Sequence, residues 1–87
     1  MDPSGRQVVL TSERWLHILV RHGELKAYRN AILLTVSNPD RIRLGDESNE
    51  RWFFAANVGP SRWLQVVVHY DGSSGRITTA FGRRCLP

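Results

Sequence analysis

The residues from Arg62 to Tyr70 give the strongest strand pattern in the chain, and they constrain its fold most. Their alternation places one set of side chains on a single face of a β-strand, namely Leu64, Val66, Val68 and Tyr70. The opposite face carries Trp63, Gln65, Val67 and His69. Because the first face is almost wholly apolar, the strand has to bury it against a second layer of structure.

The segments on either side of this strand are predicted to pair with it. Arg51 to Val58 is rich in aromatic residues and is joined to it through a Gly59-Pro60 turn. The hairpin loop from Asp71 to Gly75 leads to another strand, Arg76 to Phe81. Simple alternation in that last strand places Arg76, Thr78 and Ala80 on one face, and on the other Ile77, Thr79 and Phe81.

Two shorter segments give weaker strand signals. Arg41 to Leu44 alternates and is predicted to be a short strand. Gln7 to Leu10 is a short β-branched run, so a first strand there is plausible but weakly signalled. The sequence therefore predicts a mainly antiparallel sheet of four strands.

The layer that covers the sheet is predicted to be two helices that precede it in the chain. The first runs from Ser12 to His22, with Thr11 or Ser12 as the N-cap. Gly23 is expected to end it by taking the left-handed conformation. The second runs from Glu24 to Ser37 and is stopped by Pro39, which has no amide proton.

The first helix is predicted to be amphipathic. Its apolar stripe, expected to face the core, consists of Trp15, Leu16, Ile18, Leu19 and Val20. Arg14, His17 and Arg21 are spaced by three and four residues and share the remaining face, which is polar and basic.

Together these elements predict an α+β fold in which two N-terminal helices pack on a mainly antiparallel four-stranded sheet. At this length one domain is expected, spanning residues 1–87, and residues 1–6 are expected to be flexible. The face of the sheet turned away from the helices is expected to be free to bind a ligand.

The composition excludes some classes of protein. No window approaches the roughly 20 apolar residues that cross a bilayer, and the start of the chain lacks the pattern of a secretory signal. We therefore expect a soluble cytoplasmic protein without a membrane partner. The single cysteine, Cys85, has no partner for an internal disulfide.

The charge of the chain suggests a polyanionic partner. The formal net charge is +4, and among the 12 basic residues only Lys26 is a lysine. The guanidinium group of arginine binds phosphate oxygens in a bidentate manner. No acidic residue follows Asp71, whereas Arg76, Arg83 and Arg84 do, so the C-terminal part of the chain is basic. Genome composition is the alternative explanation for the arginine content.

The stretch His17-Ile18-Leu19-Val20-Arg21-His22-Gly23-Glu24 is similar to a helix of the type His-Ile-x-x-Arg-His-Pro-Glu. Further likeness lies in Asn38-Pro39-Asp40, in Trp63 to Val68 and in Ile77 to Phe81. With these pieces in this order, the chain resembles small nucleases and toxins of the Barnase/EndoU/colicin/RelE-like superfamily, especially the branch found in phages and mobile elements.

This resemblance implies a metal-independent ribonuclease with no cofactor, often the toxin of a toxin-antitoxin pair. Gly23 departs from the pattern, because proline is usual there and glycine should loosen the junction between the helices. The surface is not rich in lysine, so lysine-dependent chemistry of RelE-like relatives is not carried over.

Metal-free RNA cleavage uses the ribose 2′-OH as the nucleophile and needs a base, an acid and positive charge near the phosphate. Histidine suits the proton transfers because its ordinary pKa is about 6.5. We expect His17 to be the first candidate, with Arg14 or Arg21 beside it, and His22 to be a second. The alternative for each of these two histidines is that it is a surface residue at the end of a helix and takes no part in catalysis. Glu24 is expected to favour the start of the second helix rather than to orient an imidazole.

The C-terminal strand and tail supply the other candidates. Thr79 matches a polar position of the family and would contact the phosphate, or else is only a β-former. Arg83 and Arg84 would reach the RNA backbone, or else form a solvated tail. His69 is expected to be a strand-surface residue, and a zinc site built from the three histidines is not expected. Most of the aromatic residues are expected in the core rather than stacked on bases, among them Trp52, Trp63, Phe53 and Phe54.

The sequence thus predicts an RNA endonuclease whose catalytic residues are His17, Arg21, His22 and Thr79 and whose RNA-binding residues are Arg14, Arg83 and Arg84. The expected protein partner is an acidic antitoxin. Two rival readings stay open: a catalytically silent RNA-binding module, and a protein-interaction domain.

Overall fold

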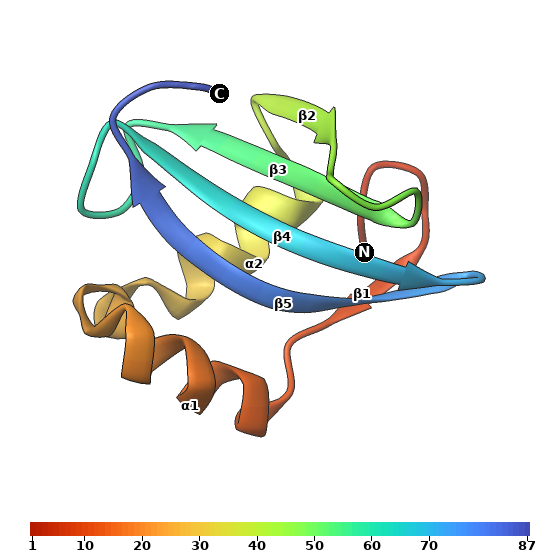
Figure 1. Cartoon of the computed structure of the whole chain (residues 1–87), viewed down its shortest axis with the longest axis horizontal. Coiled ribbons are helices and arrows are strands. Elements are labelled where there is room, and N and C mark those ends of the chain that lie inside the picture. Colours follow the sequence, from red (N-terminus) through yellow and green to blue (C-terminus); the bar gives the residue numbers. More distant parts are fainter.

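In the computed structural model, which describes residues 1–87, helices lie behind and beside a twisted sheet of five strands (Figure 1). The helical part comprises α1 (Ser12–Arg21), a 3-10 helix (Gly23–Tyr28) and α2 (Arg29–Ser37). The strands are β1 (Gln7–Val9), β2 (Arg41–Leu44), β3 (Glu50–Ala56), β4 (Trp63–Asp71) and β5 (Ser74–Arg83).

The order of strands across the sheet is β1-β5-β4-β3-β2. Neighbours pair antiparallel except for β1, which runs parallel to the first residues of β5. The predicted α+β class is confirmed, but the prediction of four strands is wrong, and the sheet is mixed. The additional strand is β1, whose three residues are too few to give a strong local signal and become a strand only by pairing with β5.

The start of α1 and the position of its end follow the sequence prediction, but the backbone conformation at that end does not. Thr11 is the N-cap, since its hydroxyl accepts a hydrogen bond from the amide of Arg14 at 3.1 Å. The predicted left-handed Gly23 is wrong: the helix ends at His22, with φ −136° and ψ 63°, and Gly23 begins the 3-10 helix. The amide of His22 still donates to the carbonyl of Ile18 at 2.7 Å.

The predicted second helix, Glu24 to Ser37, is divided into the 3-10 helix and α2. With three residues per turn, a 3-10 helix brings Leu25 and Tyr28 onto one side. Leu25 is fully buried and Tyr28 packs against the core, so burial of this pair accounts for the tighter winding. None of the helices combines the length and the apolar character that crossing a membrane requires.

The core lies between the helices and one face of the sheet. Its helical side consists of Ile18, Leu25, Ile32 and Val36, and its sheet side includes Phe53, Ile77 and the predicted apolar face of β4, which is confirmed: Leu64, Val66, Val68 and Tyr70. Full burial of a side chain of this size contributes about 1.5–3 kcal/mol.

The predicted apolar stripe of α1 is only partly buried. Ile18 is buried, Trp15 packs against the core and Leu19 is half-buried, but Leu16 is 63% exposed and Val20 is 87% exposed. Those two positions of the prediction are wrong. α2 lies over β3 and β4, whereas α1 lies beside β5 at the margin of the sheet, so α1 has only a narrow contact face (Figure 1).

Residues 1–6 lie against the end of β4. Asp2 is buried and accepts hydrogen bonds from the hydroxyls of Tyr70 and Ser4 and from the amide of Arg6. Burial opposes ionisation of Asp2, but these hydrogen bonds outweigh it and lower the pKa of its carboxyl group. Burial and the hydrogen bond to Asp2 raise the pKa of Tyr70. The N-terminal segment is thereby tied to the sheet.

Candidate functional site

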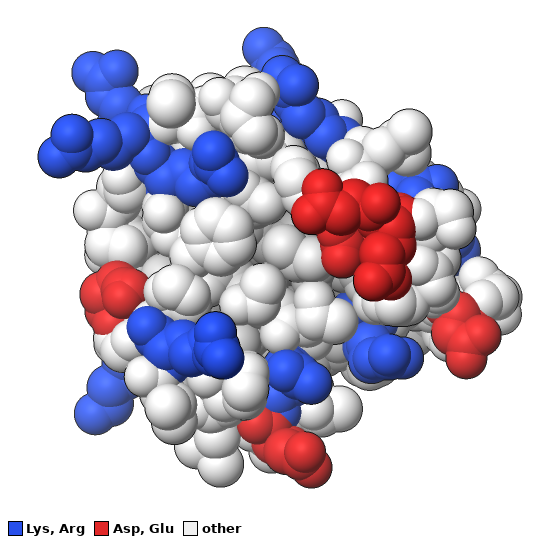
Figure 2. Space-filling model, viewed as in Figure 1, with Lys and Arg blue, Asp and Glu red and all other residues white.

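The face of the sheet turned away from α2 carries most of the groups that can do chemistry. In Figure 2 this face has mostly uncharged atoms at its centre, Lys and Arg side chains around much of its margin, one large patch of Asp and Glu side chains on the face and smaller acidic groups at the margin. The strand register assigns its members, because residues paired across strands share a face. They are Arg41, Arg43, Glu50, Trp52, Phe54, Ala56, Trp63, Gln65, Val67, His69, Arg76, Thr79, Phe81 and Arg83, which we call the open face.

A β-bulge in β5 sets which of its side chains reach the open face. The register shifts between Val67 and Val68, so Thr79 pairs with Val67 while Ile77 pairs with Val68. Thr78 is the extra residue, and its hydroxyl donates to the carbonyl of Val67. Simple alternation along the strand predicted that Ile77 and Thr79 share a face, and this prediction is wrong. The bulge lets Ile77 enter the core while Thr79 and Phe81 stay on the open face.

His22 is the predicted histidine that the structure brings to this face. It caps α1, and its ring lies 5.8 Å from the ring of Phe81, centroid to centroid and tilted by 33°. Its Nδ1 lies 3.8 Å from a carboxylate oxygen of Glu24. The imidazole is half-buried, so it is restrained by two neighbours and still reachable from solvent. Glu24, expected only to favour the start of a helix, is therefore also placed to orient His22.

Arg83 is held on the same part of the open face. Its Nη1 donates to Oε1 of Gln65 at 3.0 Å, and its Nε donates to the carbonyl of Cys85 at 3.1 Å. Gln65 is only 2% exposed and is the cross-strand partner of Phe81. These contacts fix the direction of the guanidinium group in advance, which lowers the entropy lost when it binds an anion.

Aromatic side chains form the middle of the open face. Phe54 is fully buried there, between Gln65 of β4 and Arg41 of β2. Trp63, the cross-strand partner of Arg83, is half-exposed. Trp52 is also half-exposed, and its indole N–H donates to Oε1 of Glu50 at 2.9 Å. Two indoles with accessible surface beside arginines are suited to stack on the bases of an unpaired strand.

The predicted residues on α1 lie apart from this arrangement. His17 and Arg21 are exposed, on the same side of the helix as Val20, and Arg14 is half-buried in the first turn. Arg84, beyond β5, is exposed. The structure therefore places Thr79 and Arg83 on the open face along β5, with His22 against Phe81 between them in the strand, and it leaves His17 exposed on α1.

The other end of the open face holds a second polar group. His69 lies next to Arg76 in the register, and its Nε2 is 2.6 Å from the side-chain amide nitrogen of Asn49. The chain contains no group of three His, Cys, Asp or Glu side chains arranged to hold a metal ion, and the three histidines do not converge.

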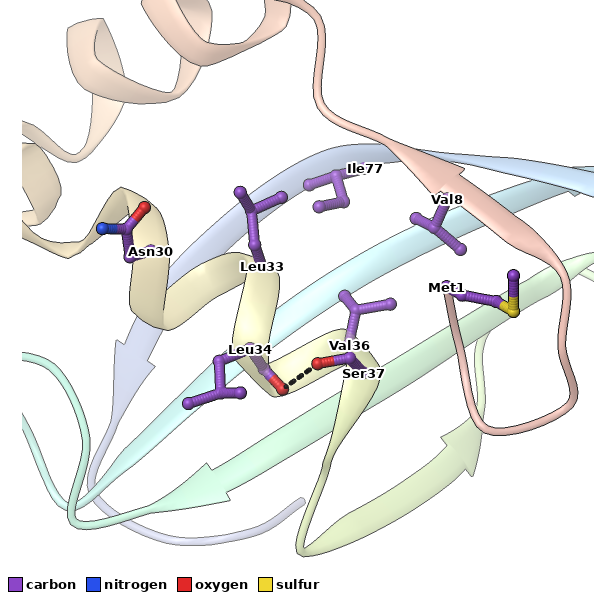
Figure 3. Close-up of a pocket in the computed structure, with 8 residues that line it drawn as sticks. All are labelled: Met1, Val8, Asn30, Leu33, Leu34, Val36, Ser37 and Ile77. Carbon is purple, nitrogen blue, oxygen red and sulfur yellow. Dashed lines mark hydrogen bonds between the residues drawn. The ribbon is translucent and has the colours of Figure 1, made fainter.

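The largest hollow in the molecule lies on the other side of the sheet. It has a volume of about 410 Å³ and is lined mostly by apolar residues of α2, β1 and β5 (Figure 3). Its polar side chains are Asn30 and Ser37, and the hydroxyl of Ser37 donates to the carbonyl of Leu34. Because no acid, base or charged side chain lines it, we place the candidate site on the open face instead.

Two residues of the site were not identified from the sequence. Gln65 is a single polar residue in an otherwise apolar strand, and that interruption was a signal for a buried hydrogen bond. Phe81 carried no such signal, because a phenylalanine in a strand usually belongs to the core. Its position against His22 depends on the bulge and on the end of α1.

Comparison with known proteins gives no relative: no family model, no curated protein and no solved structure matches this chain.

Proposed function

We propose that this protein is a metal-independent RNA endonuclease that acts on unpaired RNA laid across the open face. In this reaction the 2′-OH attacks the adjacent phosphate, and the products carry a 2′,3′-cyclic phosphate and a 5′-OH. The observation that carries the proposal is the placement of the His22 imidazole beside Phe81, on the face that also presents Thr79 and Arg83.

Each group has a chemical role that fits its position. His22 transfers a proton to or from the reacting oxygens, and Glu24 orients its ring through Nδ1. Arg83, already directed by Gln65, balances the charge that develops on the phosphate. Thr79 donates a hydrogen bond from its hydroxyl to the phosphate. Trp63 and Trp52 stack on neighbouring bases and hold the strand in place.

The direct test is RNA cleavage by purified protein in the presence of EDTA. With a mixed RNA pool, the wild-type protein should release fragments that end in a cyclic phosphate. His22→Ala should lower the rate by about 10²–10⁴-fold, the usual contribution of a general acid or base. Thermal unfolding of the variant checks that the fold is retained. Full activity of His22→Ala would remove this residue from the mechanism.

A second variant decides between the two imidazoles of α1. The family resemblance favours His17, whereas the geometry favours His22. Because His17 is an exposed residue of α1, whereas His22 is half-buried against Phe81, His17→Ala should keep most of the activity. A loss in His17→Ala that equals the loss in His22→Ala would mean that α1 meets RNA through its outer side.

A catalytically silent RNA-binding module is the second candidate. The half-exposed indoles and the arginines of the open face favour it, because they bind a strand without any proton transfer. If the protein is such a module, its affinity for RNA should fall steeply as the salt concentration rises, and it should not cleave RNA at any time. Cleavage that disappears in His22→Ala separates the nuclease from this alternative.

We further propose that the nuclease is the cytoplasmic toxin of a pair whose antitoxin is acidic. The net charge of +4 and the arginines around the open face support this, since an acidic partner would be attracted to that face and cover it. Production of the wild-type chain in bacteria should stop growth, and production of His22→Ala should not. Equal growth with both chains would argue against a toxin.

A further inference from the structure

Two arginines meet at the end of the sheet where the N-terminal segment crosses Tyr70. Arg6 precedes β1, and Arg51 lies in β3. The register places Arg51 on the face of Val68 and Tyr70, which is the helix side of the sheet. This location is opposite the open face, so the inference that follows does not rest on the proposed function.

The guanidinium group of Arg6 is held by an aromatic ring. Its Cζ lies 3.7 Å from the centroid of the Tyr70 ring, and its Nε donates to the hydroxyl of Ser4 at 3.2 Å. Its nearest carboxylate oxygen, on Asp2, is 3.7 Å from Nε. That is an ion-pair distance without a short hydrogen bond, so the terminal nitrogens of Arg6 stay available.

The guanidinium group of Arg51 is held by main-chain carbonyl groups. Its Nη1 donates to the oxygens of Ser48 at 3.0 Å and of Glu50 at 2.9 Å. These contacts use one of its three nitrogens and fix the direction of the others. No carboxylate neutralises this charge, because the ion pairs of the chain involve only Arg6 and His22.

Asp2, which forms an ion pair with Arg6 and lines a hollow beside both arginines, is already engaged. Its Oδ1 accepts from Ser4 and from the amide of Arg6, and its Oδ2 accepts from the hydroxyl of Tyr70. Its negative charge is therefore used mainly to hold the N-terminal segment on Tyr70. Two fixed positive charges at close range repel each other, and an anion between them would relieve that repulsion.

An open hollow lies between the two arginines. It has a volume of about 230 Å³ and is lined by Arg6, Ser48, Asn49, Arg51, Tyr70 and Gly72. A neighbouring hollow of about 180 Å³ shares both arginines and Tyr70 and is lined in addition by Asp2, Pro3, Ser4, Ile42 and Phe53. The acidic side chains of the β2–β3 loop, Asp46 and Glu47, line neither hollow.

We infer that this hollow is a binding site for a phosphate group, which Arg6 and Arg51 grip from two sides. Phosphate suits the site because its oxygens accept several charge-assisted hydrogen bonds from guanidinium forks at once. The phosphate comes either as the free ion or as the terminal phosphate of a nucleotide, whose nucleoside would enter the neighbouring hollow and lie against Ile42 and Phe53.

The test is a titration of the ¹⁵N-labelled protein with inorganic phosphate and, separately, with adenosine 5′-monophosphate. Either probe should shift the amide signals of Asn49 and Gly72, which line the hollow. Tighter binding of the nucleotide would identify the neighbouring hollow as a nucleoside site, and equal or weaker binding would identify free phosphate as the ligand.

Matched variants test whether Arg6 and Arg51 themselves bind the phosphate. Arg51→Gln and Arg6→Gln should each weaken binding about ten-fold, since each removes a charge-assisted contact. Arg29→Gln is the control: it loses the same charge on exposed α2 and lines neither hollow. Unfolding curves check that the variants fold, and the paired Arg6 and Arg51 variants guard against a local distortion in one of them. An absence of shifts at millimolar probe, or equal weakening by Arg29→Gln, would overturn the inference.

Discussion

The two faces of β4 differ in what their side chains do. On the helix side, the successive residues Leu64, Val66 and Val68 have no exposed surface. On the open side, the alternate residues include a half-exposed indole, a buried amide and a half-exposed imidazole, which belong to Trp63, Gln65 and His69. One face therefore stabilises the fold by burial, and the other presents polar and aromatic groups on a rigid support.

This difference shows how a small domain can carry a reactive surface. The helix side is stabilised by the transfer of apolar area from water. On the open side Phe54 and Gln65 are buried as well, whereas Trp52, Trp63 and His69 keep accessible surface. Polar groups on the open face are kept in place by a few hydrogen bonds, such as that between Arg83 and Gln65. Substitutions on the two faces should then have separable effects, on stability and on RNA.

The largest effect should come from the helix side. Phe53, in β3, is 2% exposed and belongs to the hydrophobic core between the helices and the sheet. Phe53→Ala should therefore lower the free energy of unfolding by about 3–5 kcal/mol, because burial is lost and a cavity is left. Urea unfolding followed by tryptophan fluorescence measures the change. A loss below about 1 kcal/mol would mean that the helix layer is not the main source of stability.

A smaller effect is expected on the open face. Under the proposed function, Trp63→Ala should weaken binding of single-stranded RNA by about 1–3 kcal/mol, the usual contribution of one base stacked on an aromatic ring. Fluorescence anisotropy of a labelled RNA at fixed salt measures it. Unchanged affinity would show that the half-exposed indole of Trp63 does not touch RNA.

The end of β4 allows a test by pH. The pKa of Asp2 is lowered in the folded state, so the stability that it contributes is complete above its ordinary value of 3.8. That contribution is lost as the pH falls through the lowered folded-state pKa. Asp2→Asn should therefore cost about 1–2 kcal/mol at pH 6, because a hydrogen bond to a charged group is weakened.

The matched measurement for Asp2→Asn is unfolding at pH 3 and below. There the difference between the variant and the wild-type protein should shrink, since the wild-type carboxylate becomes protonated. A difference that is constant with pH would assign the cost to packing rather than to the charge.

The smallest effect should come from the outer side of α1. Val20 is 87% exposed, so Val20→Lys should change the free energy of unfolding by less than about 0.5 kcal/mol. Thermal unfolding of the two proteins side by side is sufficient to measure it. A large loss in the free energy of unfolding would mean that the side chain of Val20 is buried in solution.

The sequence allowed much of the fold to be predicted, and the errors have identifiable causes. The alternation of β4 and the cap at Thr11 are local signals, and the structure agrees with both. The strand β1 and the division of the second helix depend on contacts with β5 and with the core, which lie far away in the chain. Local propensity cannot register such contacts.

The candidate site was harder to anticipate than the fold. His22 and Thr79 were named from a motif and a strand position, but their common location on the open face follows from where α1 ends and from the bulge at Thr78. His17 fitted the same motif and points outward. Spacing along a helix shows which residues share a side, and not which side meets the sheet.

The sequence by itself determined the classes of element, the apolar face of β4 and the excess of arginine, because period, composition and charge are properties of neighbouring residues. The tertiary structure alone decided that β1 joins the sheet, that Ile77 enters the core while Thr79 does not, and that Arg6 and Arg51 line one hollow beside Tyr70. Those outcomes depend on strand register and on the packing of segments that are distant in the chain, where a shift of one residue reverses the face that a side chain occupies.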